Sequence, residues 1–176
     1  LRGVRESGML FAVPTYAFVG LCGALVVVGL IRHLAGDLPP LAVMGTVQAT
    51  TDLGFFLVLR AFAGGCSAMT GTEAISNGVP VFRPPESRNA GITLGIMAAI
   101  LGTLLLGVTF LAQVLQVVPV MGDTVLSQIG RSVFGSFRIP YFALQAATMA
   151  ILIVGANTSF ADFPRLSAVL ARDGLM

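Results

Sequence analysis

The sequence predicts an all-α membrane protein, and three observations lead to this fold class. Hydrophobic residues make up 56% of the 176 residues, only 10% are charged, and the mean hydropathy is +0.92, whereas about a quarter of the residues in a soluble domain are charged. The apolar residues form four segments of the length that a membrane-spanning helix needs. None of these segments alternates like the strand of a membrane barrel, so helices are expected to satisfy the backbone in lipid.

The four segments can be assigned in chain order. We expect spans at about 9–31, 53–82, 92–115 and 139–160, and glycines and polar residues interrupt the second one. The connections carry turn-forming residues, including the pairs Pro39-Pro40 and Pro84-Pro85. Residues 125–137 mix apolar and polar side chains at helical spacing, which predicts a short helix lying along the membrane surface.

The arginines predict the orientation, because cytoplasmic loops of membrane proteins retain an excess of basic residues. If the chain starts in the cytoplasm, six arginines lie on that side and three on the other. The cytoplasmic set is Arg2, Arg5, Arg83, Arg88, Arg165 and Arg172, and the opposite set is Arg32, Arg131 and Arg138. We therefore expect a multi-pass protein of the inner cell membrane that starts inside. A first residue Leu1 without a signal peptide also predicts an internal piece of a longer protein.

The interrupted segment carries the strongest functional signal. Glu73 lies about six residues from its centre, or roughly 9 Å along a helix. An ionisable side chain at that depth costs from ~2.5 to over 10 kcal/mol, so we expect it to face a cavity or a partner. Thr70, three residues before it, and Asn77, four after it, would share its helical face and offer oxygen ligands to a cation.

The glycines of this segment predict a break in the helix. Gly64-Gly65 and Gly71 would bracket non-helical backbone in mid-membrane, where free carbonyl and amide groups bind ions and substrates. A structural alternative stays open, in which the glycines permit close packing and Glu73 pairs with Arg60. Two interpretations also stay open for Thr158 and Ser159: bonding back to the preceding turn, or a second ion site.

The chain lacks the residues that several classes of function require. The chain has no Lys, which a phosphate-binding loop requires. Proteolysis by a serine within the membrane would need a histidine in the helix bundle, but His33, the only histidine, is expected in a loop. Cys22 and Cys66 have no spacing typical of a metal site. A net charge of +2 does not suggest nucleic-acid binding. We therefore expect no enzyme activity, no cofactor and no nucleic-acid partner.

Three stretches resemble a known family. They are LRGVRESG at the start, LRAFAGGCSAMTGTEAISNGVPVFRPPESRNA in the middle and NTSFADFPRLSAVLARDG at the end. Together they resemble the amino acid, polyamine and organocation (APC) permease superfamily, and within it the KimA-type potassium and proton symporters. The resemblance implies a LeuT-like fold of two inverted five-helix repeats, of which this fragment would hold helices five to eight.

The resemblance also implies a site. Thr70 and Glu73 match the sixth-helix potassium-binding positions of that family, Gly71 lies between them, and Thr158 and Ser159 match hydroxyls that form a second ion site in sodium-coupled relatives. A proton-coupled member need not use the second site. The metal ligands expected in this chain are thus Thr70 and Glu73, and the family's other ligands lie on helices that the fragment lacks.

The function expected from these residues is proton-coupled potassium uptake by alternating access. The alternative is an amino acid permease of the same superfamily, although a buried carboxylate suits a cation better than an amino acid carboxylate. A membrane receptor or assembly subunit without transport activity is a third hypothesis, which uptake would exclude. The expected partners are the potassium ion, the proton and the lipid bilayer, and a homodimer is left open.

Overall fold

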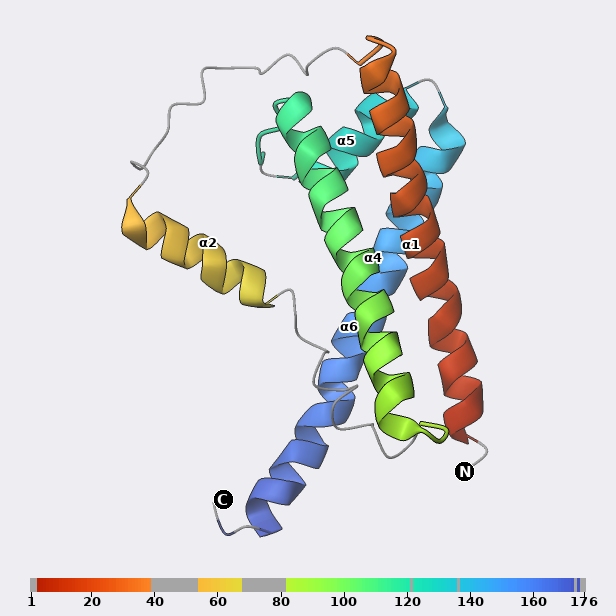
Figure 1. The fold of residues 1–176 in the computed structure, drawn as a ribbon, viewed down its shortest axis with the longest axis vertical. Helices are drawn as coiled ribbons and strands as arrows, with labels where there is room; N and C mark the ends of the chain where they lie inside the picture. The colour runs from red at the N-terminus through yellow and green to blue at the C-terminus, as the bar shows by residue number, and fades with distance from the viewer. Residues whose placement is uncertain are drawn as a thin grey trace. The chain divides into compact units, whose positions relative to one another are not determined.

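The computed structural model describes residues 3–38, 54–67, 82–120, 122–135, 137–172 and 174. This part of the chain is helical (Figure 1). Its helices are α1 (Gly3–Leu34), α2 (Phe55–Ser67), α4 (Glu86–Val114), α5 (Val125–Phe134) and α6 (Arg138–Arg172). In the described residues, β pairing is limited to an isolated bridge between Val120 and Asp123. The predicted all-α class is confirmed for the described residues.

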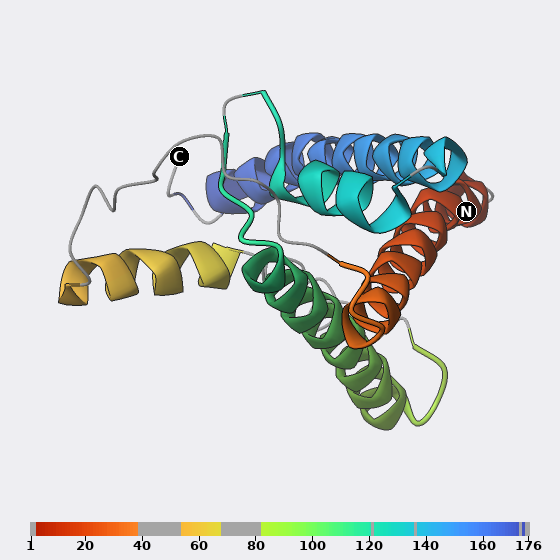
Figure 2. The same cartoon turned by 90° about the horizontal axis from the view of Figure 1, so that it is seen from above.

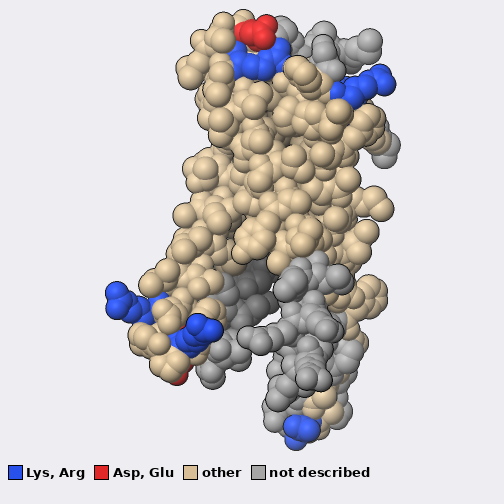
Figure 3. All heavy atoms as spheres, turned by 90° about the vertical axis from the view of Figure 1, so that its right-hand side faces the viewer, with Lys and Arg blue, Asp and Glu red and all other residues tan. Residues whose placement is uncertain are grey.

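Among the described residues, three helices are long and apolar enough to cross a membrane. The candidate spans are Phe11–Leu34 in α1, Glu86–Val114 in α4 and Arg138–Asn157 in α6. Only 17%, 6% and 11% of their most apolar windows are buried, so large apolar side chains such as Leu106 and Leu152 are exposed. On the face drawn in Figure 3, residues that are neither acidic nor basic, drawn in tan, cover most of the described surface. Such surfaces require an apolar surrounding, and the chain is therefore a membrane protein.

The chain divides into two compact units, residues 1–41 with 107–176, and residues 42–106. In the first unit α1 packs against α6, and the short helix α5 packs against both (Figure 2). The buried apolar side chains of this unit form its core. They are Cys22, Leu25, Val26 and Leu38 around α1, Leu111 and Leu115 around the end of α4, Ile129, Val133 and Phe134 on α5, and Leu144 and Ala147 on α6.

Two glycines allow α1 and the last turns of α4 to approach closely. A methyl group added at Gly29 would lie 2.6 Å from Leu111 Cδ1, and one added at Gly107 would lie 2.4 Å from Val26 Cγ1. Both distances are shorter than a carbon–carbon contact, so a larger residue at either position requires its neighbour to move.

The structure corrects the predicted start of the helix break. Helix α2 continues through Gly64 and Gly65 and reaches Ser67, so the backbone there is helical, although we predicted a break from Gly64. A glycine in a helix costs about 1 kcal/mol relative to alanine, which weakens a helix but does not by itself end it. Residues 68–81, which hold Gly71, lie outside the described residues.

The two helices near the C-terminal end differ in how well the sequence predicted them. The short helix expected at 125–137 is confirmed as α5, where Thr124 forms the N-cap and its side chain accepts a hydrogen bond from the backbone N–H of Ser127. Helix α6 is longer than the expected segment, because it continues past Phe160 to Arg172.

Candidate functional site

The predicted ion-binding residues fall in two places. Thr70, Gly71 and Glu73 lie outside the described residues, as does Asn77. Thr158 and Ser159 lie on α6, whose backbone is helical at both positions, but their side chains are outside the description. The predicted ligand set therefore stays a prediction. The described part of the structure shows the helices that lead into it.

Helix α2 leads directly into the predicted site. It is an apolar helix of 13 residues, about 20 Å long at 1.5 Å per residue, whereas the hydrocarbon core of a membrane is about 30 Å thick. Arg60 lies in its first half and is exposed, as are Phe56 and Cys66. A full crossing by this segment thus requires about 10 Å more than α2 provides.

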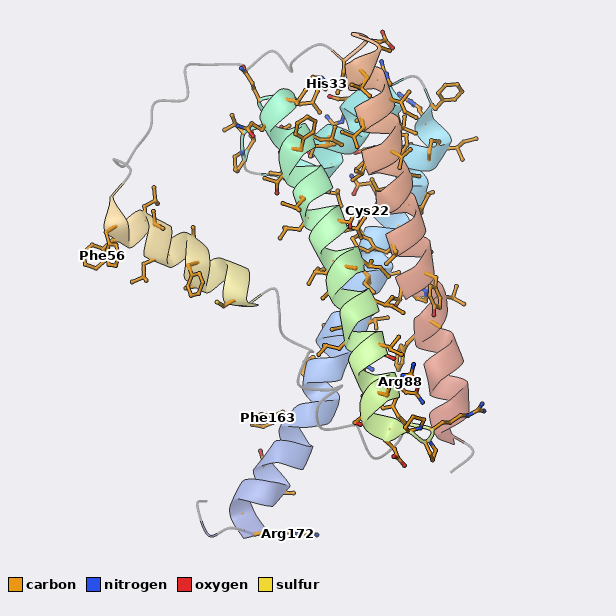
Figure 4. The ribbon with its side chains drawn as sticks, in the orientation of Figure 1. Cys22, His33, Phe56, Arg88, Phe163 and Arg172 are labelled. Atoms are coloured by element: carbon orange, nitrogen blue, oxygen red, sulfur yellow. The ribbon has the colours of Figure 1, made fainter. Side chains whose placement is uncertain are left out.

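Helix α1 and the end of α4 run in the same direction. The rings of His33 and Phe110 meet edge to face, with centroids 5.6 Å apart, and His33 lies near the end of α1 (Figure 4). Gly29 faces Leu111 and Val26 faces Gly107, so positions that come earlier on α1 face positions that come earlier on α4. The C-terminal ends of both helices therefore lie at the same end of this unit, which we call the α5 end.

A cluster of polar contacts at the α5 end is centred on Arg32. Its Nε and Nη2 donate hydrogen bonds to Asp37 Oδ2 at 3.2 and 3.0 Å, and Nη2 also donates to the Asp37 carbonyl at 3.0 Å. Nη1 donates to the carbonyls of Ser132 and Val133 at 3.1 and 2.7 Å. Because a guanidinium has five N–H donors, all the donors of Arg32 are engaged.

A second polar cluster joins α5 to α6. The hydroxyl of Tyr141 is 3.0 Å from that of the buried Ser127, and it accepts a hydrogen bond from Gln145 Nε2 at 3.1 Å. Arg131 forms an ion pair with Asp123 at 3.0 Å, and its guanidinium lies 5.9 Å from the Tyr141 ring centroid. Tyr141 and then Asp123 raise the pKa of Arg131, which keeps this side chain charged.

The sequence did not indicate the role of these polar residues. Arg32 and Arg131 entered the sequence analysis only as basic loop residues that set the orientation. A usable signal was the helical pattern of 125–137, because an amphipathic helix needs partners for its buried side and its ends. That pattern did not identify Arg32, which lies 100 residues before its acceptor Ser132.

The described residues hold no group of three or more His, Cys, Asp or Glu side chains that could bind a metal ion. The predicted residues Thr70 and Glu73 lie outside the described residues.

The helices place the protein in the class of helical membrane proteins, with at least three candidate spans. No family model matches the chain. The chain is similar to the potassium transporter KimA of Bacillus subtilis (strain 168), with 42% identity over 179 aligned residues. The similarity covers the whole of this chain and 29% of that transporter, so the chain spans less than a third of the length of this relative.

Proposed function

We propose that this chain is part of the membrane domain of a proton-coupled potassium importer that works by alternating access. The observation that carries the proposal is the 42% identity with the potassium transporter KimA over the full length of the chain. The apolar helices support it, because transport across a bilayer requires membrane-spanning segments. We propose further that the protein has the LeuT-like fold of the APC superfamily and lies in the inner cell membrane with its start in the cytoplasm.

The parallel course of α1 and the last turns of α4 supports a crossing between them. If both helices span the membrane in the same direction, the chain from Leu34 to Glu86 has to return to the side on which it started. Helix α2 supplies about two thirds of the required length. We propose that residues 68–81 supply the remainder, so that the second crossing would contain Thr70, Gly71 and Glu73 within the membrane.

In this proposal Thr70 and Glu73 bind the potassium ion near the middle of the membrane. Thr70 supplies a neutral oxygen and Glu73 a carboxylate, which are ligands that hard cations prefer. An apolar surrounding favours the protonated carboxyl group, whereas a bound cation favours the carboxylate. Glu73 can therefore hold a proton when the site is empty and release it when a potassium ion binds. This exchange would couple the transport of potassium to the transport of protons. Thr158 and Ser159 are the proposed second, dispensable site.

Replacement of Glu73 tests the proposal. Glu73→Gln keeps the size and one oxygen of the side chain but removes its charge and its titration. We expect it to lower rubidium uptake by the full-length protein at least about tenfold and to abolish the dependence of uptake on external pH, since removal of a buried charged ligand costs more than 1.4 kcal/mol. Uptake is measured in cells that lack their other potassium importers, with membrane expression quantified in parallel.

Glu86→Gln is the matched control. Glu86 is in the first turn of α4 and is exposed, so its replacement should leave uptake within about twofold of the wild type. Uptake by Glu73→Gln with the wild-type rate and pH profile would contradict the role of Glu73. If the wild type moved amino acids and not rubidium, the amino acid permease would become the preferred function.

A further inference from the structure

Helix α5 has too little length to stay folded by itself. It contains 10 residues, and isolated helices shorter than about 12–15 residues are marginal in water. Its buried residues Ile129, Val133 and Phe134 lie on one side, so packing on α1 and α6 supplies part of the stability. Its two ends still require partners for the backbone groups that no further turn satisfies.

Both ends of α5 have such partners. At the first turn, the Thr124 side chain caps the backbone N–H of Ser127, and the Ser127 hydroxyl contacts the Tyr141 hydroxyl on α6 at 3.0 Å. At the last turn, Arg32 of α1 donates to the carbonyls of Ser132 and Val133. A cation at a helix C-terminus also interacts favourably with the helix dipole.

The surroundings of Arg32 hold its guanidinium in place for this contact. The Asp37 carboxylate and carbonyl accept the three N–H groups that do not face α5, so the side chain cannot turn away without breaking both sets of bonds. Gly135, which ends α5 with a φ of 48°, lies against the same guanidinium, because a methyl group added there would be 3.6 Å from Nη1.

We propose that Arg32 is a latch that fastens the last turn of α5 to the end of α1, so that these two elements and the start of α6 form one rigid body. On this view α5 is not an independent lid over the end of the helices. The latch is a property of the fold at the α5 end, and it does not depend on which species the protein transports.

Hydrogen exchange of the full-length protein in lipid nanodiscs, read by mass spectrometry of peptides, tests the latch. In the wild type we expect the peptide that covers α5 to exchange as slowly as the last turns of α1, and much more slowly than residues 116–120 between α4 and α5. Arg32→Gln should accelerate exchange in α5 by about tenfold or more, since it removes charge-assisted hydrogen bonds. Exchange around Cys22, in the middle of α1, should stay unchanged.

Arg138→Gln is the matched control, because Arg138 also lies at the α5 end, is exposed, and makes none of these contacts among the described residues. It should leave exchange in α5 within about twofold of the wild type. If Arg32→Gln fails to fold, Arg32→Lys and Asp37→Asn should each accelerate exchange in α5 to an intermediate degree. Wild-type exchange in α5 for all three variants, or wild-type α5 that exchanges as fast as residues 116–120, would overturn the latch.

Discussion

At the scale of single residues, the packing of α1 on α4 depends on two positions that have no side chain. Gly29 accepts the end of Leu111, which can rotate, whereas Gly107 accepts the γ-methyl groups of Val26. A valine in a helix has one strongly preferred rotamer, so Val26 cannot turn away from an added group. Gly107 is therefore the less tolerant position, although the sequence alone presents it as one of 21 similar glycines.

Gly107→Ala tests this contact. The added methyl group would lie 2.4 Å from Val26 Cγ1, and overpacking of this kind typically costs about 1–3 kcal/mol. We expect a lower melting temperature of the purified full-length protein in detergent, measured by thermal unfolding.

The double variant Gly107→Ala, Val26→Ala is the control for this prediction. It removes the γ-methyl groups that the new methyl group would meet, so it should be more stable than the sum of the two single changes predicts. Additive effects of the two substitutions would show that the two residues do not compete for space.

At the scale of the elements, the sequence predicted the helices well where a continuous pattern defines them. The unbroken apolar runs of α1 and α4 and the amphipathic spacing of α5 each indicate a helix without knowledge of the partners. The prediction failed at Gly64 and Gly65, because we interpreted two glycines as a break although α2 continues through them. It could not find Arg32, since its acceptors on α5 come 100 and 101 residues later.

The candidate site was less accessible to prediction than the fold. Glu73 and Thr70 were selected by their depth in an apolar segment and by resemblance, and their geometry depends on residues 68–81, outside the described part. The contacts that the structure does show, such as Ser127 with Tyr141, involve ordinary polar residues. Nothing in their residue type separates them from other polar residues near the end of a span.

The corrected course of α2 makes a prediction about its glycines. Gly64 and Gly65 have helical backbone, and nothing described lies within 4 Å of a methyl group added at either. Alanine favours a helix over glycine by about 1 kcal/mol, so Gly64→Ala and Gly65→Ala should keep rubidium uptake within about twofold of the wild type. Loss of uptake in both variants, at normal expression, would restore the earlier prediction that the break starts at Gly64.

At the scale of the whole molecule, the direction of the helices limits the topology. The ends of α1 and α4 meet at the α5 end, where Phe110 contacts His33, and α6 starts next to α5. We therefore propose that the connection from α4 through α5 to α6 stays on one side of the membrane and that α6 crosses back. The sequence assigns six arginines to the opposite side of the membrane, against Arg32, Arg131 and Arg138 at this end, so the positive-inside rule predicts an outward-facing α5 end.

Single cysteines labelled by a membrane-impermeant maleimide in intact cells test this topology. Gly122 lies between α4 and α5, but its φ of +88° would strain a cysteine, so the nearby exposed Val120 is the better choice. In the full-length protein we expect Val120→Cys to react in intact cells, and Ser87→Cys and Ser167→Cys to react only after the membrane is made permeable.

Because Ser87 is at the start of α4 and Val120 follows its end, the pair reports the two ends of one span and needs no assumption about the other helices. Reaction of Ser87→Cys but not Val120→Cys in intact cells would reverse the orientation, and it would place the Arg32 latch on the cytoplasmic side.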